Sequence, residues 1–110
     1  MPLSERYRIE IFLPDAVSPA YAQLINRLEN EIAYAFGGCT VIQGTKGLYR
    51  SQEEKIIQDR IHLLFADIEL GVNDRQALEA YVDSLQQMIN SDLKEEKILI
   101  AVHSVFHQTI

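Results

Sequence analysis

The feature that most constrains the fold of this chain is the order in which two hydrophobic periodicities follow one another. Residues 6–13 (RYRIEIFL) carry apolar side chains at every second position, which is typical of a strand with one buried face. Residues 21–36 carry them three and four positions apart, which is the spacing of an amphipathic helix. The rest of the chain repeats this alternation. The predicted order is strand, helix, strand, strand, helix, strand.

Residues that favour caps and turns separate these segments. Ser18-Pro19 is expected to open the first helix and Gly37-Gly38 to end it, since Ser accepts first-turn amides and Gly adopts the left-handed terminal conformation. Asn73 or Asp74 opens the second helix, which ends at residues 90–92. The other strands are expected at residues 39–43, 55–68 and 98–106, with residues 48–49 continuing the second strand beyond a bend at residues 44–47.

Two successive β-α-β halves define a ferredoxin-like fold. We therefore predict an α+β sandwich of βαββαβ order, with a four-stranded antiparallel sheet and two helices on one face. The length of 110 residues fits one such domain over residues 1–110.

Helices cover only one face of such a sheet, and the other face is expected to be apolar here. If the side chains of each strand alternate strictly between the two faces, the open face carries Phe12, Ile56, Leu64, Leu99, Ala101 and Val105. Exposed apolar patches of this extent usually mark a contact site. We therefore expect a homo-oligomer, a dimer or a trimer, that forms through the open sheet face.

Charge and cysteine content limit the partners and the compartment. The chain has 10 Lys plus Arg against 16 Asp plus Glu, a formal net charge of -6, which argues against nucleic acid and against anionic membranes. No uncharged run approaches the roughly 20 residues that span a bilayer. Residues 1–6 carry charges where a signal peptide needs an apolar core, and the single Cys39 cannot form an internal disulfide. These features predict a cytoplasmic protein.

The glycines around the second strand offer a candidate ligand site. Backbone amides of glycine-rich loops can face phosphate, and Lys46 would add a positive charge. The spacing is neither that of a Walker A loop nor that of a dinucleotide fingerprint, so a helix end and a turn also explain these glycines. The predicted loop at residues 44–54 is the best place for a recognition element. The ligand-binding candidates are Gly44, Lys46, Gly47 and Arg50.

The histidines do not predict a metal site. His103 and His107 are four residues apart, which on a strand is roughly 13 Å, too far to chelate one ion. Cys39 has no second Cys at ligand spacing. An enzyme is nevertheless an alternative: two sheets packed face to face as a dimeric α/β barrel would enclose a pocket. His62, His103 and Arg60 would line it as proton-transfer or orienting groups.

The chain resembles the small trimeric ferredoxin-like proteins of the PII signalling type and the CutA type. The resemblance is one of topology over about residues 6–107. It is carried by Gly38-Cys39-Thr40-Val41, by the loop before Lys55 and by the closing strand ILIAVHSVFH. In PII-like proteins the loop between strands two and three contacts partners, and nucleotides bind between subunits. The resemblance therefore implies a recognition loop at residues 44–54, with Lys46 and Arg50 as its cationic members.

Taken together, these features predict a non-catalytic regulatory module that binds a small anionic ligand or a protein partner. The small enzyme of the barrel type is the alternative, and a purely structural partner protein is a third interpretation. The sequence does not identify a cofactor.

Overall fold

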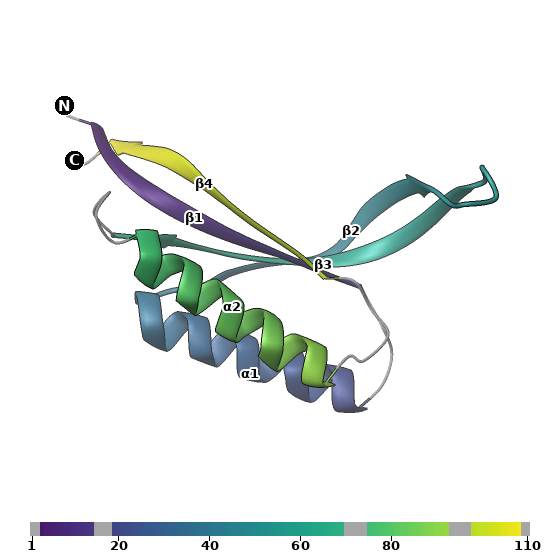
Figure 1. The fold of residues 1–110 in the computed structure, drawn as a ribbon, viewed down its shortest axis with the longest axis horizontal. Helices are drawn as coiled ribbons and strands as arrows, with labels where there is room; N and C mark the ends of the chain where they lie inside the picture. The colour runs from purple at the N-terminus through teal and green to yellow at the C-terminus, as the bar shows by residue number, and fades with distance from the viewer. Residues whose placement is uncertain (1–2, 15–18, 70–74, 93–97, 109–110) are drawn as a thin grey trace.

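The computed structural model describes residues 3–14, 19–69, 75–92 and 98–108. Its strands form one antiparallel sheet in the order β2-β3-β1-β4, with both helices on one face (Figure 1). The predicted ferredoxin-like βαββαβ fold is confirmed. The elements are β1 (Leu3–Pro14), α1 (Pro19–Phe36), β2 (Thr40–Arg50), β3 (Ile56–Ile68), α2 (Arg75–Asp92) and β4 (Leu99–Gln108).

The hydrophobic core lies between the sheet and the two helices. The odd-numbered residues Ile9, Ile11 and Leu13 of β1 are buried there, as their alternation predicts. The helices contribute the apolar stripes that the spacing of three and four predicts, namely Tyr21, Leu24, Ile25, Leu28, Ile32, Leu78, Leu85 and Ile89. Gly37 ends α1 at a φ of 82°, and its amide donates to the Ala33 carbonyl at 2.8 Å. The predicted caps Ser18, Asn73 and Asp74 lie outside the described residues.

The prediction for the face assignment of β3 was wrong. Leu64 pairs with Ile11 and is fully buried beneath the helices, whereas Leu63 pairs with Phe12 on the open face. Residues paired directly across an antiparallel ladder lie on the same face, so β1 fixes the phase of β3, and Ile56 shares the phase of Leu64. Both phases of β3 carry apolar side chains, and the sequence alone therefore cannot choose between them. Phe12, Leu99, Ala101 and Val105 do lie on the open face, as their pairing shows.

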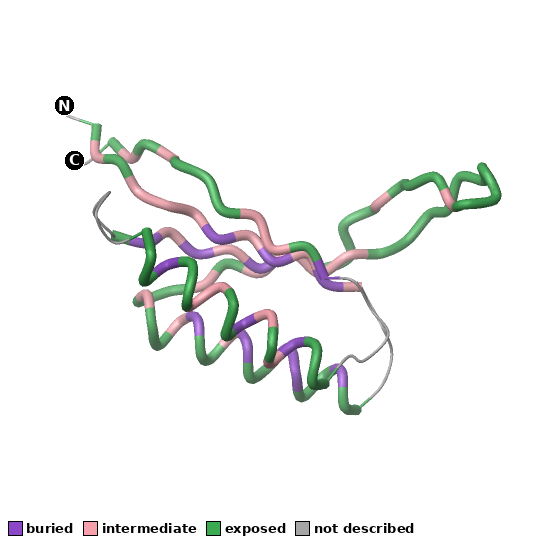
Figure 2. The backbone as a smooth tube through the Cα atoms, in the orientation of Figure 1, coloured by how far each residue is buried: buried purple, intermediate pink, exposed green. Residues whose placement is uncertain are grey.

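The predicted loop at residues 44–54 is largely a strand. β2 continues to Arg50, and a turn at residues 51–55 joins it to β3. A register shift between Ile42 and Thr45 lets the strand bend while it stays paired, and Gly44 adopts a φ of 70° at this bulge. Residues 44–61 therefore form a two-stranded arm that projects beyond the helices (Figures 1 and 2). Nearly every residue of this arm is exposed.

Candidate functional site

The arm has two chemically different sides, which the strand pairing defines. On one side Lys46 lies opposite Arg60, and Arg50 lies opposite Ile56. We call this the cationic side; it continues the helix-facing side of the sheet. The other side continues the open face, with Thr45 opposite Ile61 and Tyr49 opposite Ile57. We call it the apolar side.

The cationic side places two like charges directly across the strands. Lys46 and Arg60 are register partners, and like charges in this position repel each other. The Arg60 guanidinium also folds over the bulge, with Nη2 at 3.3 Å from the position that a Cβ on Gly44 would take. Arg50 lies four residues from Lys46, about 13 Å along the strand. This arrangement suits a ligand that brings negative charge.

A hollow of about 310 Å³ lies at the root of the arm. It is lined by α1 between Tyr21 and Glu29, by Gln43 next to the bulge and by His62 of β3, and the Glu29 carboxylate is its one acidic lining group among the described residues. The His62 ring makes an edge contact with Tyr21, with the ring centroids 6.5 Å apart. His62 alternates with Arg60 along β3, so the hollow and the cations share one side of the sheet. Together they form the candidate ligand site.

The structure brings together only some of the predicted ligand residues. Lys46 and Gly44 lie by the bulge, next to which Gln43 lines the hollow, and Arg50 lies farther out near the turn. Gly47 has a packing role, because an added Cβ would come within 2.5 Å of Ile61 Cδ1. Sequence reasoning missed Asn26 and Gln43. It also assigned Arg60 to a different site, because the cross-strand register that pairs Arg60 with Lys46 is not visible in the pattern.

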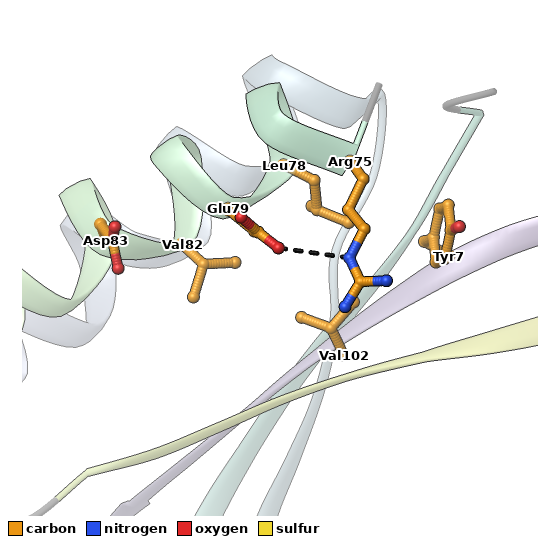
Figure 3. Close-up of a pocket in the computed structure, with 7 residues that line it drawn as sticks. All are labelled: Tyr7, Arg75, Leu78, Glu79, Val82, Asp83 and Val102. Atoms are coloured by element: carbon orange, nitrogen blue, oxygen red, sulfur yellow. Dashed lines mark hydrogen bonds and ion pairs between the residues drawn. The ribbon is translucent and has the colours of Figure 1, made fainter. Parts of the chain in front are cut away.

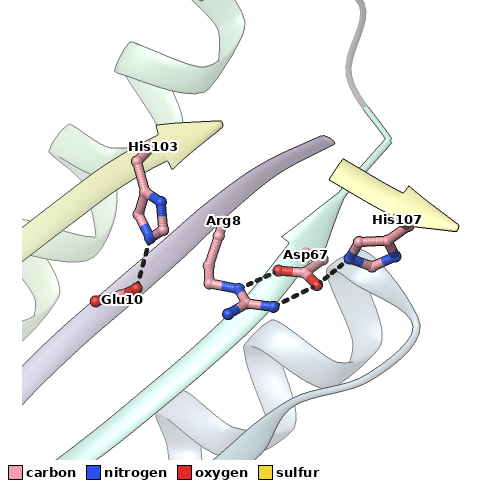
Figure 4. Close-up of polar contacts among 5 residues, drawn as sticks. All are labelled: Arg8, Glu10, Asp67, His103 and His107. Atoms are coloured by element: carbon pink, nitrogen blue, oxygen red, sulfur yellow. Dashed lines mark hydrogen bonds and ion pairs between the residues drawn. The ribbon is translucent and has the colours of Figure 1, made fainter. Parts of the chain in front are cut away.

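Polar side chains on the open sheet face form pairs between neighbouring strands (Figure 4). Arg8 donates two hydrogen bonds to Asp67, from Nε to Oδ1 at 2.6 Å and from Nη2 to Oδ2 at 3.0 Å. The His107 ring lies 2.6 Å from the same carboxylate, and His103 lies 2.5 Å from Glu10. The Arg8 hydrogen bonds hold the pKa of Asp67 below its usual range, although burial opposes this shift. The Arg8 guanidinium and both His rings on this face therefore have carboxylate partners within the chain.

The alternative catalytic set does not meet in one place. His103 lies on the open face beside Glu10, whereas His62 lies on the helix-facing side of β3 and Arg60 lies on the arm. A pocket lined by all three is therefore absent from a single chain. Among the described residues, no three His, Cys, Asp or Glu side chains cluster as metal ligands.

A second concavity of about 380 Å³ lies between α2 and the strands β1 and β4 (Figure 3). Its lining is mainly apolar, with Leu78 and Val82 facing Tyr7 and Val102. The Arg75 guanidinium at its mouth donates to Glu79 at 3.2 Å, so its charge is offset within the helix. This groove lacks the convergent cations of the arm. No helix in the described part of the chain is long and apolar enough to cross a membrane.

Comparison with known proteins supports the fold and the topological resemblance to PII-like and CutA-like proteins. No family model matches the sequence, and a search of curated proteins found no match. Among solved structures, the chain is similar to CPII, a nitrogen regulatory PII-like protein from Thiomonas intermedia K12 solved with ADP, AMP and bicarbonate. The identity is 14%, with 98% of this chain and 100% of that chain covered and a TM-score of 0.57.

Two further structures show the same fold. The divalent cation tolerance protein Cut A1 from Thermus thermophilus is 14% identical, with 91% of this chain and 82% of that chain covered and a TM-score of 0.55. A phage SAM lyase in complex with S-methyl-5'-thioadenosine is 10% identical, with 94% and 90% covered and a TM-score of 0.58. The predicted resemblance to PII-like and CutA-like proteins is confirmed as one of topology. At these identities the likeness establishes the fold alone.

Proposed function

We propose that the protein is a non-catalytic regulatory module that binds a small anionic ligand on the cationic side of its arm. The observation that carries this proposal is the placement of Lys46 directly opposite Arg60, beside the hollow at the root of the arm. An anion between these two side chains would accept charge-assisted hydrogen bonds from both and screen their mutual repulsion. The Arg60 guanidinium lies over Gly44, with Nη2 at 3.3 Å from the place that an added Cβ would take.

The spacing of the cations suggests how ligand size would be distinguished. A compact anion such as bicarbonate would contact Lys46 and Arg60 only, whereas the phosphates of a nucleotide would also extend towards Arg50 and its uncharged part into the hollow. CPII, whose fold this chain shares, was solved with ADP, AMP and bicarbonate. These three compounds are therefore the first probes. Asn26 and Gln43 would supply neutral hydrogen-bonding groups to the uncharged part of a nucleotide.

The proposal includes assembly through the open sheet face, as a dimer or a trimer in the cytoplasm. Phe12, Leu63 and Phe65 form an apolar centre on that face, as their pairing places them. The charges beside this centre are paired within the chain, which lowers the cost of burying them. In this arrangement the cationic side of the arm would remain open to the ligand.

Calorimetric titration tests the ligand site. ADP, AMP and bicarbonate are titrated into the wild-type protein, into Lys46→Gln/Arg60→Gln and into Lys55→Gln. Lys55 is the matched control, because it is an exposed cation in the turn beyond the paired part of the arm. We expect the double variant to lose at least about tenfold in affinity, the scale of a lost hydrogen bond to a charged group, and Lys55→Gln to lose less than about twofold.

Comparison of ligands tests the same site a second way. Arg50→Gln should weaken ADP binding and leave bicarbonate binding unchanged, because only the larger ligand reaches that far along the strand. Absence of binding by all three probes, or equal affinities of the double variant and the wild type, would refute the proposed site.

A further inference from the structure

The concavity between α2 and the strands β1 and β4, which we call the α2 groove, takes no part in the proposed anion site. Ile9 and Val102 are register partners on the helix-facing side of the sheet, yet Ile9 is 1% exposed and Val102 is 39% exposed. The helices therefore cover the centre of the sheet and leave its β4 edge open. Leu78 and Val82 of α2 face this opening (Figure 3). The groove volume of about 380 Å³ lies in the range of small-molecule sites, roughly 300–1,000 Å³.

The rim of the α2 groove carries a row of charged side chains from α2. Arg75, Glu79 and Asp83 follow one another at intervals of four residues, so they lie along one side of the helix. The Arg75 guanidinium donates to the Glu79 carboxylate at 3.2 Å, and these two charges offset each other. No cation of the described ranges pairs with Asp83. The rim therefore keeps one uncompensated negative charge beside an apolar floor.

This combination of floor and rim favours one class of ligand. Burial of apolar ligand surface against the floor supplies affinity to any ligand of suitable size. The Asp83 carboxylate adds a charge-assisted hydrogen bond only for a ligand that carries a positive donor. It repels an anion, as does the formal net charge of -6 of the whole chain. Asp83 lies about 6 Å along the helix from Glu79. A ring on the floor therefore needs only a short chain to bring an ammonium group to the carboxylate.

We propose that the α2 groove binds a small amphipathic organic cation. Its apolar body packs on Leu78, Val82 and Val102, and its ammonium group contacts the Asp83 carboxylate. This site lies apart from the cationic side of the arm, and the inference does not rest on the anion site. The two sites prefer ligands of opposite charge, so one set of probes separates them.

Three probes of similar size and different charge test the inference, namely phenethylamine, 2-phenylethanol and 3-phenylpropionate. Each is titrated into the wild-type protein at pH 7 and low ionic strength, and amide NMR shifts report both affinity and place. We expect phenethylamine to shift the Val82 and Val102 amides saturably and to leave Gly44 and Gly47 of the arm unchanged. Phenethylamine should bind about three- to tenfold more tightly than 2-phenylethanol, and 3-phenylpropionate should bind more weakly than both.

Two variants change the rim charge in opposite directions. Asp83→Asn keeps the shape of the side chain and should lower phenethylamine affinity to that of 2-phenylethanol, whose own affinity should not change. Arg75→Gln removes the cation from the rim and releases the Glu79 carboxylate, so it should raise phenethylamine affinity. Asp59→Asn is the matched control, because Asp59 is an exposed carboxylate on the arm, and it should leave all affinities within about twofold of the wild type. A gain and a loss at one site cannot both result from unfolding.

Several results would overturn the inference. Equal wild-type affinities for phenethylamine and 2-phenylethanol would show an apolar groove without selection for a cation. An unchanged phenethylamine affinity in Asp83→Asn would show that this carboxylate is not the partner. Preferred binding of 3-phenylpropionate, shifts away from the groove or no saturable binding by any probe would also refute the site. The calorimetric titrations with ADP, AMP and bicarbonate judge the anion site separately.

Discussion

The paired charges on the open face predict a measurable stability difference for Asp67→Asn. Asp67 accepts two hydrogen bonds from Arg8 and lies 2.6 Å from the His107 ring. The substitution keeps the size of the side chain and removes its charge. It leaves the Arg8 guanidinium, which also lies 4.7 Å from the centre of the Phe65 ring, without its anionic partner.

The burial of this pair sets the expected magnitude. The Asp67 side chain is 18% exposed and the Arg8 side chain is 30% exposed. Exposed ion pairs contribute about 0–1 kcal/mol, whereas breaking a fully buried pair costs about 3–5 kcal/mol. The Arg8–Asp67 pair lies between these limits. We therefore expect Asp67→Asn to lower the free energy of unfolding by about 1–2 kcal/mol near neutral pH.

The pH dependence of this difference has a definite sign. The folded-state pKa of Asp67 is lowered, mainly by the Arg8 hydrogen bonds, below its unfolded value of about 3.9. The stabilisation by the carboxylate is therefore fully present above the unfolded pKa and is lost as the pH falls through the folded pKa. The difference between the wild type and Asp67→Asn should therefore shrink as the pH falls below about pH 4.

Urea unfolding at pH 7, 5 and 3 measures this difference, at one fixed protein concentration because assembly would couple to unfolding. Asp83→Asn is the matched control, since Asp83 is an exposed residue of α2 away from the open face, and it should change stability by less than about 0.5 kcal/mol. A difference at pH 7 no larger than that of the control would refute the reasoning. So would a difference that is unchanged at pH 3.

Three other predictions concern single residues elsewhere in the chain. Gly44→Ala should destabilise the protein by about 1 kcal/mol in urea unfolding, because Gly44 has a φ of 70° at the bulge. The control Gly38→Ala, which has open space around it, should change stability by less than about 0.5 kcal/mol. Equal effects of the two substitutions would contradict this reasoning. Burial, with a smaller contribution from Glu29, raises the pKa of the Cys39 thiol, so at pH 8 it should react with a disulfide reagent several-fold more slowly than glutathione, and urea should abolish the difference. Burial also raises the pKa of Tyr81 to about 12, so an absorbance titration should show a phenolate that forms near this pH in the wild type and is missing in Tyr81→Phe; an unchanged titration would show that the assignment is wrong.

The sequence predicted the elements whose pattern has one dominant period. β1 buries Ile9, Ile11 and Leu13, and both helices bury the stripes set by their spacing, because each has one face that is mainly polar. β3 was predicted as a strand but with its faces exchanged, since Leu63 and Leu64 are equally apolar. Pairing with β1 decides that question, and pairing is a property of the folded sheet.

The sequence suggested the cations of the candidate site but not how they are arranged. Lys46 and Arg50 were identified as cations beside glycines, but Gly44 was interpreted as part of a loop. In the structure Gly44 occupies a bulge that bends β2 without ending it. As a result, the cation nearest to Lys46 is Arg60 from the neighbouring strand, which is fourteen residues away in the sequence. A cross-strand pair of this kind has no signature in the linear pattern.

Amide NMR during a titration with ADP tests the central claim most directly, because the glycines that mark the candidate site can be compared with glycines elsewhere. Gly44 and Gly47 lie on the arm beside Lys46, whereas Gly37 and Gly38 line a separate hollow at the end of α1. We predict saturable shifts of the Gly44 and Gly47 amide signals, with those of Gly37 and Gly38 unchanged, and loss of the shifts in Lys46→Gln/Arg60→Gln. Saturable shifts confined to Gly37 and Gly38, or no shifts at any of the four, would contradict the proposed site.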